Sequence, residues 1–384
     1  MRISAATDVV HGRPLVSIIV NNHNYGHFLP NAIDSALVQT YAPLEVIVVD
    51  DGSTDQSRDV IAGYGNRILP VLKENGGQAS AFNAGLAASL GDILIFLDAD
   101  DALLPEAAAL AVQQFTPGTV KVHWPLLRTD EALEPTGQLT PPEDLPAGDF
   151  RQDIFRFGPA TSLSPPTSGN AWARSFLELV MPIPEQDHRI AADGYLYGLA
   201  PGFGDIGRVS TPQGFYRIHR KNNYRGMELD ERLRLGLVCI EHQWRVLRAH
   251  ARQYDIAVDE PAWERHSYFH QLQAAAREIE SVVPPATPLI LLDEARWSIE
   301  GGIAGRKVFP FPECDGYYAG PPENDSAAIG ELERLRETHG IEYFVIAAPA
   351  FWWLEDYSGF AQHLRSRYVE IVANSRLIIF KLEK

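Results

Sequence analysis

The chain has 384 residues, and its 33 basic and 50 acidic side chains give a net charge of −17. This acidity disfavours nucleic acid or an anionic membrane surface as the main partner. The length predicts two or three domains, and 45% hydrophobic residues supply enough material for buried cores. The two cysteines, Cys239 and Cys314, are too few for a disulfide framework or a zinc site and favour a reducing compartment.

No apolar run approaches the length that spans a bilayer, and the first residues lack the apolar core of a signal peptide. We therefore expect a cytoplasmic protein without a transmembrane segment. Peripheral contact with the inner face of the membrane and assembly into a homo-oligomer both stay open.

The first half of the chain alternates short apolar runs with helical segments of about 10 to 15 residues. Continuous runs rich in Val, Ile, Leu and Phe are typical of strands that are buried on both faces of a sheet. The expected strands are 15–21, 44–49, 68–72, 93–97 and 120–127, and the expected helices are 27–39, 79–90 and 105–115. This repetition predicts an α/β fold with a mostly parallel, doubly wound sheet.

Carboxylates directly follow two of these strands: Asp50 and Asp51 follow the second, and Asp98, Asp100 and Asp101 follow the fourth. Ligands of open α/β sheets bind outside the carboxyl ends of the strands. Three like charges within four residues repel one another unless a cation compensates them. Asp98 and Asp100 are suited to Mg²⁺ or Mn²⁺, which prefers one or two carboxylates together with substrate phosphates. The alternative is an acidic loop in which Asp101 caps the next helix.

The turn after the second strand combines ligand and capping residues. We expect Asp51 to accept a hydrogen bond from a base or ribose, while Ser53 or Asp55 caps the following helix. No Gly-x-Gly-x-x-Gly follows the first strand, and no Gly-Lys-Ser/Thr occurs in the chain. Both the dinucleotide fingerprint and the P-loop are therefore absent.

A second polar turn precedes the helix expected at 79–90. Gly76 and Gly77 would let the backbone approach a ligand closely. Gln78 and Asn83 stand on the first turns of that helix, whose N-terminus favours phosphate. The turn is thus expected to contact the same ligand as the carboxylates.

Four stretches together carry a family resemblance: VSIIVNN at 16–22, VVDDGSTD at 48–55, GGQASAFNAG at 76–85 and FLDADD at 96–101. In this order and spacing they resemble family 2 glycosyltransferases, over about residues 14–224. The resemblance implies the GT-A fold (nucleotide-diphospho-sugar transferase-like), a nucleotide-sugar donor, a divalent metal and inversion at the anomeric carbon.

The resemblance also implies roles for particular residues. Asp100 matches the metal-binding aspartate of the Asp-x-Asp motif, Asp98 matches a ribose or diphosphate contact, and Asn21 and Asp51 match base-contacting positions. Asp193 matches the general base, although Ala192 stands where the family often has a glutamate. One carboxylate suffices to take the proton of the acceptor hydroxyl, and an aspartate that merely caps a helix is the alternative. The residues predicted to bind the donor are Asn21, Asn22, Tyr25, Asp51, Gln78, Asn83, Asp98, Arg217 and His219.

A compact basic cluster follows this region. Arg217, Arg220, Lys221 and Arg225 lie close together in an otherwise acidic chain, which suits a diphosphate or an anionic acceptor, or else a solvated face. His219, in a Tyr-Arg-x-His segment similar to one that the family has near the donor phosphates, is expected to contact phosphate or metal.

The rest of the chain changes character beyond residue 227. Apolar stripes predict helices at 229–254 and 261–283, and prolines mark a linker before an α/β tail that resembles an accessory domain of some bacterial glycosyltransferases. In this tail the aromatic residues 351–354 either stack on sugar rings or, as we favour, seal an interface. The predicted domains are a GT-A catalytic domain at 1–227, a helical connector at 228–284 and a small C-terminal α/β domain at 285–384.

The sequence thus predicts an inverting, metal-dependent glycosyltransferase that acts in cell-surface polysaccharide or glycoconjugate synthesis. A UDP-sugar is the favoured donor, and a saccharide or a lipid-linked molecule is the expected acceptor. A non-catalytic nucleotide-sugar-binding or scaffold protein is the alternative, because the glutamate before Asp193 is missing. A nucleotidyltransferase fits less well, since residues 21–26 contain no Lys or Arg.

Overall fold

The computed structural model describes residues 13–159, 163–219, 228–297 and 302–382. The chain forms two compact units, one of residues 1–223 with 238–267 and the other of residues 224–237 with 268–384. Helix α8 (Leu229–Gln253) therefore contributes its first turns to the second unit and the remainder to the first. The division into a catalytic domain, a helical connector and a C-terminal domain at residues 227 and 284 remains a prediction.

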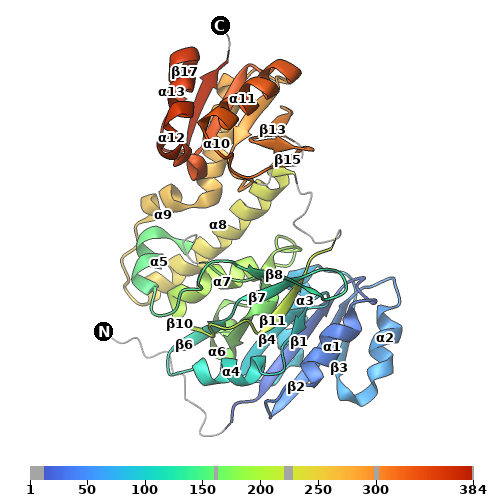
Figure 1. Ribbon diagram of the computed structural model, residues 1–384. Coiled ribbons are helices and arrows are strands. Elements are labelled where there is room, and N and C mark those ends of the chain that lie inside the picture. The colour runs from blue at the N-terminus through green and yellow to red at the C-terminus, as the bar shows by residue number, and fades with distance from the viewer. Residues whose placement is uncertain (1–12, 160–162, 220–227, 298–301, 383–384) are drawn as a thin grey trace. The chain divides into compact units, whose positions relative to one another are not determined.

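The first unit is built on a seven-stranded sheet with the order β10-β6-β9-β4-β1-β2-β3 in its described part (Figure 1). Neighbouring strands are parallel except β9, which runs antiparallel to both β4 and β6. The expected mostly parallel sheet is confirmed, and the antiparallel β9 was not foreseen. The strands are β1 (Val16–Asn22), β2 (Leu44–Asp51), β3 (Leu69–Lys73), β4 (Ile93–Asp98), β6 (Thr119–His123), β9 (Asn170–Ala173) and β10 (Asp205–Arg208).

Helices cover both faces of this sheet. Apolar residues of α1 (Leu29–Leu37) and α4 (Ala107–Gln114) share one core with Ile18 and Val20 of β1. On the opposite face α3 (Gln78–Ala88) lies against Ile19, where a Cβ on Gly85 would overlap the Ile19 side chain. Glycine at 85 permits this close approach. The remaining helices of the unit are α2 (Ser57–Tyr64), α5 (Arg151–Phe157), α6 (Arg174–Val180), α7 (Ala192–Phe203) and α9 (Glu260–His266).

A smaller sheet has the order β5-β11-β7-β8. Its first strand in sequence, β5, begins shortly after the carboxyl end of β4. Strand β5 (Ala102–Leu103) follows the acidic residues and pairs antiparallel with β11 (Gly214–Arg217). This pairing brings the end of β11 to the residues that follow β4. The strand expected at 120–127 is in fact two, β6 and β7 (Leu126–Thr129), and the segment 133–166 contains β8 (Pro135–Thr140) and α5.

The second unit has a five-stranded sheet with the order β13-β12-β16-β18-β17. The expected C-terminal α/β domain is thus confirmed as a fold. The helix expected at 261–283 is interrupted at Ser267, whose ψ of 115° is extended. The elements are α10 (Tyr268–Val282), β12 (Leu289–Leu292), β13 (Val308–Pro310), β14 (Glu313–Cys314), β15 (Tyr317–Tyr318), α11 (Asp325–His339), β16 (Tyr343–Ala347), α12 (Trp353–Asp356), α13 (Ser358–Arg367), β17 (Val369–Ala373) and β18 (Leu377–Lys381).

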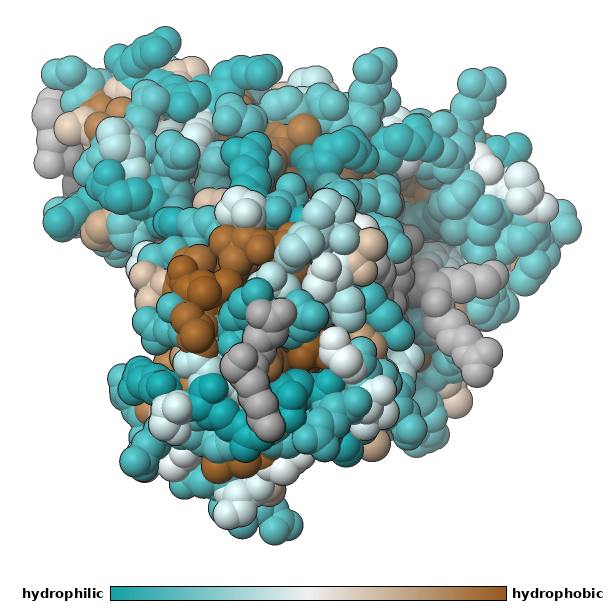
Figure 2. Space-filling model, turned by 90° about the horizontal axis from the view of Figure 1, so that it is seen from above, coloured by the Kyte–Doolittle hydropathy of each residue, from teal (hydrophilic) through white to brown (hydrophobic). Residues whose placement is uncertain are grey.

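The surface is mostly hydrophilic in the view of Figure 2, which shows one larger brown area of hydrophobic side chains and several smaller, separate ones. Of the large apolar side chains in the second unit, Tyr317, Trp352, Val369 and Ile371 are exposed. Within the described ranges, no helix combines the length and the apolar composition that crossing a bilayer requires.

Candidate active site

The register of the central strands brings predicted site residues to one edge of the sheet. Asn21 lies opposite Asp98, and Asn22 lies opposite Asp50. The Asn21 side chain is only 8% exposed, and its Oδ1 atom has no hydrogen-bond partner among the described residues. A buried polar atom without a partner is costly, so a donor group on a ligand would stabilise this position.

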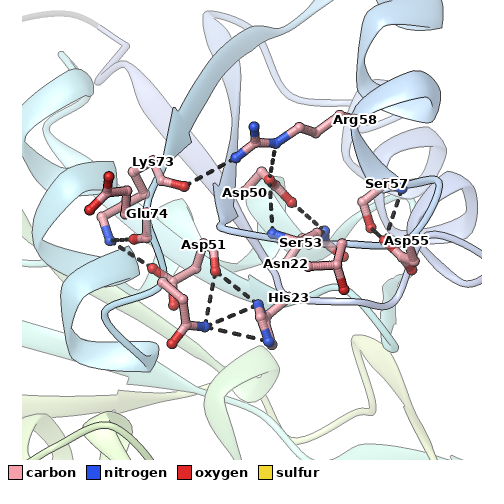
Figure 3. A network of polar contacts seen from close by, with 12 residues as sticks. Asn22, His23, Asp50, Asp51, Ser53, Asp55, Ser57, Arg58, Lys73 and Glu74 are labelled. Carbon is pink, nitrogen blue, oxygen red and sulfur yellow. Dashed lines mark hydrogen bonds and ion pairs between the residues drawn. The ribbon is translucent and has the colours of Figure 1, made fainter.

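The Asp51 carboxylate is already hydrogen-bonded by groups of the protein itself (Figure 3). Its Oδ1 accepts hydrogen bonds from Lys73 Nζ at 2.7 Å and from the backbone N–H of Gly76 at 2.9 Å, and its Oδ2 accepts one from the N–H of Gly77 at 2.7 Å. The carboxylate is 3% exposed. Asp51 therefore fixes the conformation of the 73–77 turn, while its contact with a base stays a prediction.

The neighbouring polar side chains bind one another and the backbone of nearby turns (Figure 3). Asp50 is fully buried and pairs with Arg58 at 2.9 Å. Asp55 accepts the N–H of Ser57 at 3.0 Å at the start of α2, and Ser53 accepts the N–H of Asn24 at 2.9 Å. The N-cap of α2 is Gln56, which makes no side-chain cap hydrogen bond, so the expected N-cap at Ser53 or Asp55 was wrong. Asp55 binds the first helical N–H from the position before the cap.

Three carboxylates crowd together after β4. Asp101 accepts a hydrogen bond from Ser168 Oγ at 2.6 Å and one from the N–H of Arg217 at 3.0 Å. Burial, followed by repulsion from Asp100, raises the pKa of Asp98 and of Asp101 well above the ordinary range. A bound cation would relieve this repulsion.

The smaller sheet delivers His219 to this cluster. His219 Nε2 lies 2.9 Å from Asp100 Oδ2, although the two residues are 119 positions apart, and the ring packs edge-on against Tyr25 at 5.4 Å. Burial first, and then Asp100, raises the pKa of the Tyr25 phenol. Tyr25, Asp98, Asp100 and His219 are thus brought together as predicted site residues.

Arg217 contacts the backbone of the segment that carries the carboxylates. Its Nε donates to the Asp100 carbonyl at 2.6 Å, its Nη2 donates to Asn31 Oδ1 at 3.1 Å, and its guanidinium lies 4.2 Å from the Phe28 ring. These contacts orient the loop that carries Asp100, and contact with donor phosphates stays a prediction. The other members of the predicted basic cluster, Arg220, Lys221 and Arg225, lie outside the described residues.

These residues fit a divalent cation. In the described parts of the chain no three His, Cys, Asp or Glu side chains form a ready metal cage, but Mg²⁺ normally takes one or two carboxylates and completes its shell with phosphate and water. Asp100 and Asp98 supply hard oxygen ligands, and His219 adds an imidazole nitrogen, which suits Mn²⁺.

Thr167 links this cluster to the predicted base. The residue opens a short 3₁₀ turn (Thr167–Gly169) in which Ser168 Oγ accepts the N–H of Asp98 at 3.2 Å, and the Thr167 side chain acts to lower the pKa of both Asp98 and Asp193. Gln78 Nε2 donates to Thr167 Oγ1 at 3.3 Å, and Gln78 Oε1 accepts the N–H of Ala192 at 2.9 Å. Sequence reasoning missed Thr167, because one threonine in a proline-rich segment gives no local signal.

Asp193 lies in the first turn of α7, where it accepts the N–H of Gly194 at 2.9 Å. Burial raises the pKa of its carboxyl. The N-cap of α7 is Ala191, at φ 61°, so capping by Asp193 does not account for the aspartate at this position. General-base catalysis by Asp193 stays a prediction.

Lys121 on β6 is a second residue that the sequence analysis missed. It is 2% exposed, and its Nζ donates to Ser164 Oγ at 2.7 Å and lies 5.4 Å from the Trp172 ring. Burial lowers its pKa to about 7, while the charge of Asp193 acts in the opposite direction. A buried amine thus faces the candidate base. Its only sequence signal is a lysine inside an apolar strand.

The N-terminus of α3 differs from expectation. The N–H groups of Gln78 and Ala79 donate to the carbonyls of Arg189 and His188, at 2.9 and 3.1 Å. Gly77 has φ +89°, and a Cβ there would lie 2.6 Å from the Cα of Arg189. The chain itself therefore takes the place that a phosphate was expected to occupy, because the 188–189 backbone packs onto the glycine.

Asn83, like Asn22 and Asp51, is a predicted donor-binding residue that no described contact joins to Tyr25, Asp98, Asp100 or His219. Its Nδ2 donates to the Ile183 carbonyl at 2.9 Å and its Oδ1 accepts the Ile183 N–H at 2.9 Å. The side chain thereby ties α3 to the segment before α7. A direct donor contact by Asn83 stays a prediction.

Comparison with known proteins agrees with this geometry. Residues 17–154 match the family model described as glycosyl transferase family 2. An uncharacterized glycosyltransferase of Nostoc sp. is 38% identical over 214 residues, which cover 54% of this chain and 66% of that protein. Chondroitin synthase of Pasteurella multocida is 42% identical over 109 residues, which cover 28% of this chain and 11% of that protein. The matched stretch is thus just under two thirds of the first relative and a small part of the second.

Among solved structures, S. aureus TarS 1–349 in complex with UDP-GlcNAc is similar at 17% identity with a TM-score of 0.46, covering 68% of this chain and 82% of that chain. Mannosyltransferase PcManGT from Pyrobaculum calidifontis, in complex with GDP-Man and Mn²⁺, is similar at 18% identity with a TM-score of 0.43, covering 71% of this chain and 77% of that chain. The family model and the sheet order agree with the expected GT-A type of fold. Residues 17–154 of this chain are thus similar in sequence to glycosyl transferase family 2.

Proposed function

We propose that this chain is an inverting glycosyltransferase that moves a sugar from a nucleotide-diphosphate donor to a hydroxyl group of an acceptor. The observation that carries the proposal is the 167–169 turn, where Ser168 Oγ accepts the N–H of Asp98 and Gln78 joins Thr167 Oγ1 to the N–H of Ala192, the residue before Asp193. One carboxylate belongs to the cluster suited to the leaving diphosphate, and the other is suited to deprotonate the acceptor. A single displacement needs both roles in one site, with the base and the leaving group on opposite faces of the anomeric carbon.

In this reaction the Asp193 carboxylate takes the proton of the acceptor hydroxyl while the hydroxyl oxygen forms a bond to the anomeric carbon. The bond from that carbon to the diphosphate oxygen breaks on the opposite side, and its electron pair leaves with the nucleoside diphosphate. The configuration is thereby inverted. Burial raises the pKa of Asp193, which makes the carboxylate a stronger base than an exposed aspartate.

Asp100 and Asp98, with His219, would hold Mg²⁺ or Mn²⁺ in the proposed enzyme. Such an ion, when bound, neutralises negative charge on the leaving diphosphate. The chain's own contribution is to fix the loop: Arg217 holds the Asp100 carbonyl and Ser168 holds the Asp101 carboxylate. Asn21, Asn22, Asp51 and Gln78 are proposed to line the donor side.

The substrates are part of the proposal. A UDP-sugar is the favoured donor, and matches to proteins named chondroitin synthase and hyaluronan synthase support a saccharide acceptor, or a lipid-linked one, in polysaccharide or glycoconjugate synthesis. We propose a cytoplasmic location with peripheral contact at the inner face of the membrane.

The proposal is tested first by thermal shift with UDP-glucose, UDP-galactose, UDP-GlcNAc and GDP-mannose, with and without Mn²⁺. A ligand that binds the folded chain raises its melting temperature, so the panel selects the donor. Transfer to water is then measured as release of nucleoside diphosphate. A chain that binds a donor but releases no diphosphate would support the non-catalytic alternative.

Asp193→Asn then separates binding from chemistry. The variant keeps the size of the side chain but cannot accept a proton, so turnover should fall about 10²- to 10⁴-fold with donor binding unchanged. The matched control is Asp187→Asn, because the Asp187 side chain is about half exposed and its ion pair within the described residues is with His242, at 3.5 Å. Diphosphate release by Asp193→Asn at the parent rate would remove Asp193 from the mechanism.

A further inference from the structure

The topology of the second unit points to one position for a ligand. Strand β12 lies between β13 and β16, and the chain passes from it to the parallel β13 on one side, then through α11 to the parallel β16 on the other side. Where the winding direction of an open α/β sheet reverses, ligands bind outside the carboxyl ends of the two strands. The segments that follow β12 and β16 flank this point, and both carry unusual residues.

Glu294, after β12, is joined to two tryptophans after β16. The Nε1 atoms of Trp352 and Trp353 donate to Glu294 Oε1 at 2.9 and 3.2 Å. Trp353 is fully buried, whereas 37% of Trp352 is exposed. The Trp352 ring is therefore anchored through its nitrogen, and much of its apolar surface remains open to solvent.

Tyrosines complete the surroundings of these tryptophans. The Tyr357 ring lies 6.1 Å from the ring of Trp352 and 4.9 Å from that of Trp353. On the β14–β15 hairpin, burial and then the charge of Glu294 raise the pKa of Tyr318 to about 12, which places the phenol near the carboxylate. Aromatic and carboxylate side chains from three separate segments thus meet at the carboxyl edge of β12.

The backbone at Glu294 is also strained. Glu294 has φ +56° and Ala295 has φ +57°, a left-handed conformation that side chains with a Cβ rarely adopt. The Asp293 carboxylate accepts the N–H groups of Ala295 and Trp297, at 3.1 and 2.8 Å, and holds the turn in place. Strain that the surrounding structure maintains is typical of ligand sites.

We propose that this aromatic cluster, formed by Glu294, Tyr318, Trp352 and Tyr357, binds a saccharide. An indole face that is fixed in advance stacks on the apolar C–H face of a pyranose ring with little loss of side-chain entropy, and the second oxygen of Glu294 accepts a hydroxyl group. Arg296, whose Nε lies 3.8 Å from Glu294 Oε2, offsets part of the negative charge of Asp293 and Glu294. The remaining negative charge disfavours uronic acids and phosphorylated sugars. The ligand is therefore an uncharged sugar or an amino sugar. The proposal concerns binding alone and does not rest on the proposed transfer reaction.

The test uses the full chain, without nucleotide, and measures binding by isothermal titration and by saturation-transfer NMR. The probes are cellohexaose, maltohexaose and chitohexaose as uncharged ligands, glucosamine hexamer as the amino-sugar ligand and hexagalacturonate as the anionic ligand. At least one uncharged or amino-sugar probe should bind, and Trp352→Ala should weaken its affinity about tenfold, while Trp352→Phe should retain most of it. Val369→Ala, which changes another exposed side chain of the second unit, is the matched control and should bind like the parent.

Three results would overturn the proposal, provided that the variants melt like the parent. The first is no binding of any uncharged or amino-sugar probe at up to about 10 mM. The second is equal affinity of the parent and Trp352→Ala. The third is binding of hexagalacturonate alone. Because none of these measurements needs turnover, failure of the glycosyltransferase assay would leave the result of this test unchanged.

Discussion

Replacing Asp51 by asparagine should destabilise the first unit, whatever its effect on a ligand. The change removes a charged acceptor from two backbone N–H groups, those of Gly76 and Gly77, and from Lys73 Nζ. Hydrogen bonds to charged groups contribute about 1.5–3 kcal/mol each. The Lys73 side chain is 23% exposed, so the ion pair adds about 1 kcal/mol or less.

Water and the new amide oxygen recover part of this loss, so we expect the free energy of unfolding to fall by about 3 kcal/mol. For a unit of this size, this corresponds to a decrease of roughly 6–12 °C in the melting temperature. Thermal and urea denaturation, followed by circular dichroism, measure both quantities. Lys73→Met is the control: it removes only the ion pair and should cost about 1 kcal/mol or less. An Asp51→Asn protein that melts within about 2 °C of the parent would refute the structural role of the carboxylate.

Three further predictions concern the metal, pH and the buried lysine. Asp100→Ala should abolish the Mn²⁺ dependence of nucleoside diphosphate binding in isothermal titration, and retained dependence would place the ion elsewhere. Burial, and then His242, lower the pKa of His188 from 6.5 to about 4. Below pH 6.5 the unfolded chain therefore binds a proton that the folded chain does not, and stability falls as the pH falls towards 4. Urea midpoints at pH 7 and pH 5 should show a loss of about 1–2 kcal/mol that is smaller in His188→Leu, and equal losses would exclude His188 as the cause. Lys121→Met removes a cation near Asp193, so the pKa of Asp193 should rise and the acid limb of kcat/KM should move to higher pH; an unmoved limb would show that Lys121 does not act on the base.

The central strands could be predicted because each is a single apolar run. Strands β1, β2, β3 and β4 lie within one or two residues of the expected positions. Strand β9 has only four residues, Asn170–Ala173, and no apolar run marks it. The strand expected at 120–127 was wrong as one element, because it divides into β6 and β7 around Trp124 and Pro125, and proline lacks the N–H that a ladder needs.

The candidate site was predictable where its motifs are local. The Asp98–Asp101 segment is continuous in sequence, so its crowding could be foreseen, whereas the partners that organise it could not. Thr167 and Lys121 become neighbours of Asp193 only through the sheet, and the packing of residues 188–189 against Gly77 depends on the fold of the whole unit. A pattern within a few residues carries no information on such long-range contacts.

The pairing of Asp100 with His219 across 119 positions has a consequence for folding. Joining residues so far apart requires closure of a long loop, whose entropy is lost before the contact forms. The proposed metal site would therefore be complete only after β11 has joined its sheet, so a folding intermediate without β11 would lack it. A nucleotide and metal ion that recognise this site would bind the native domain alone and raise its free energy of unfolding with the logarithm of ligand concentration. Metal-dependent nucleotide binding would thus report, during refolding, when β11 has joined its sheet.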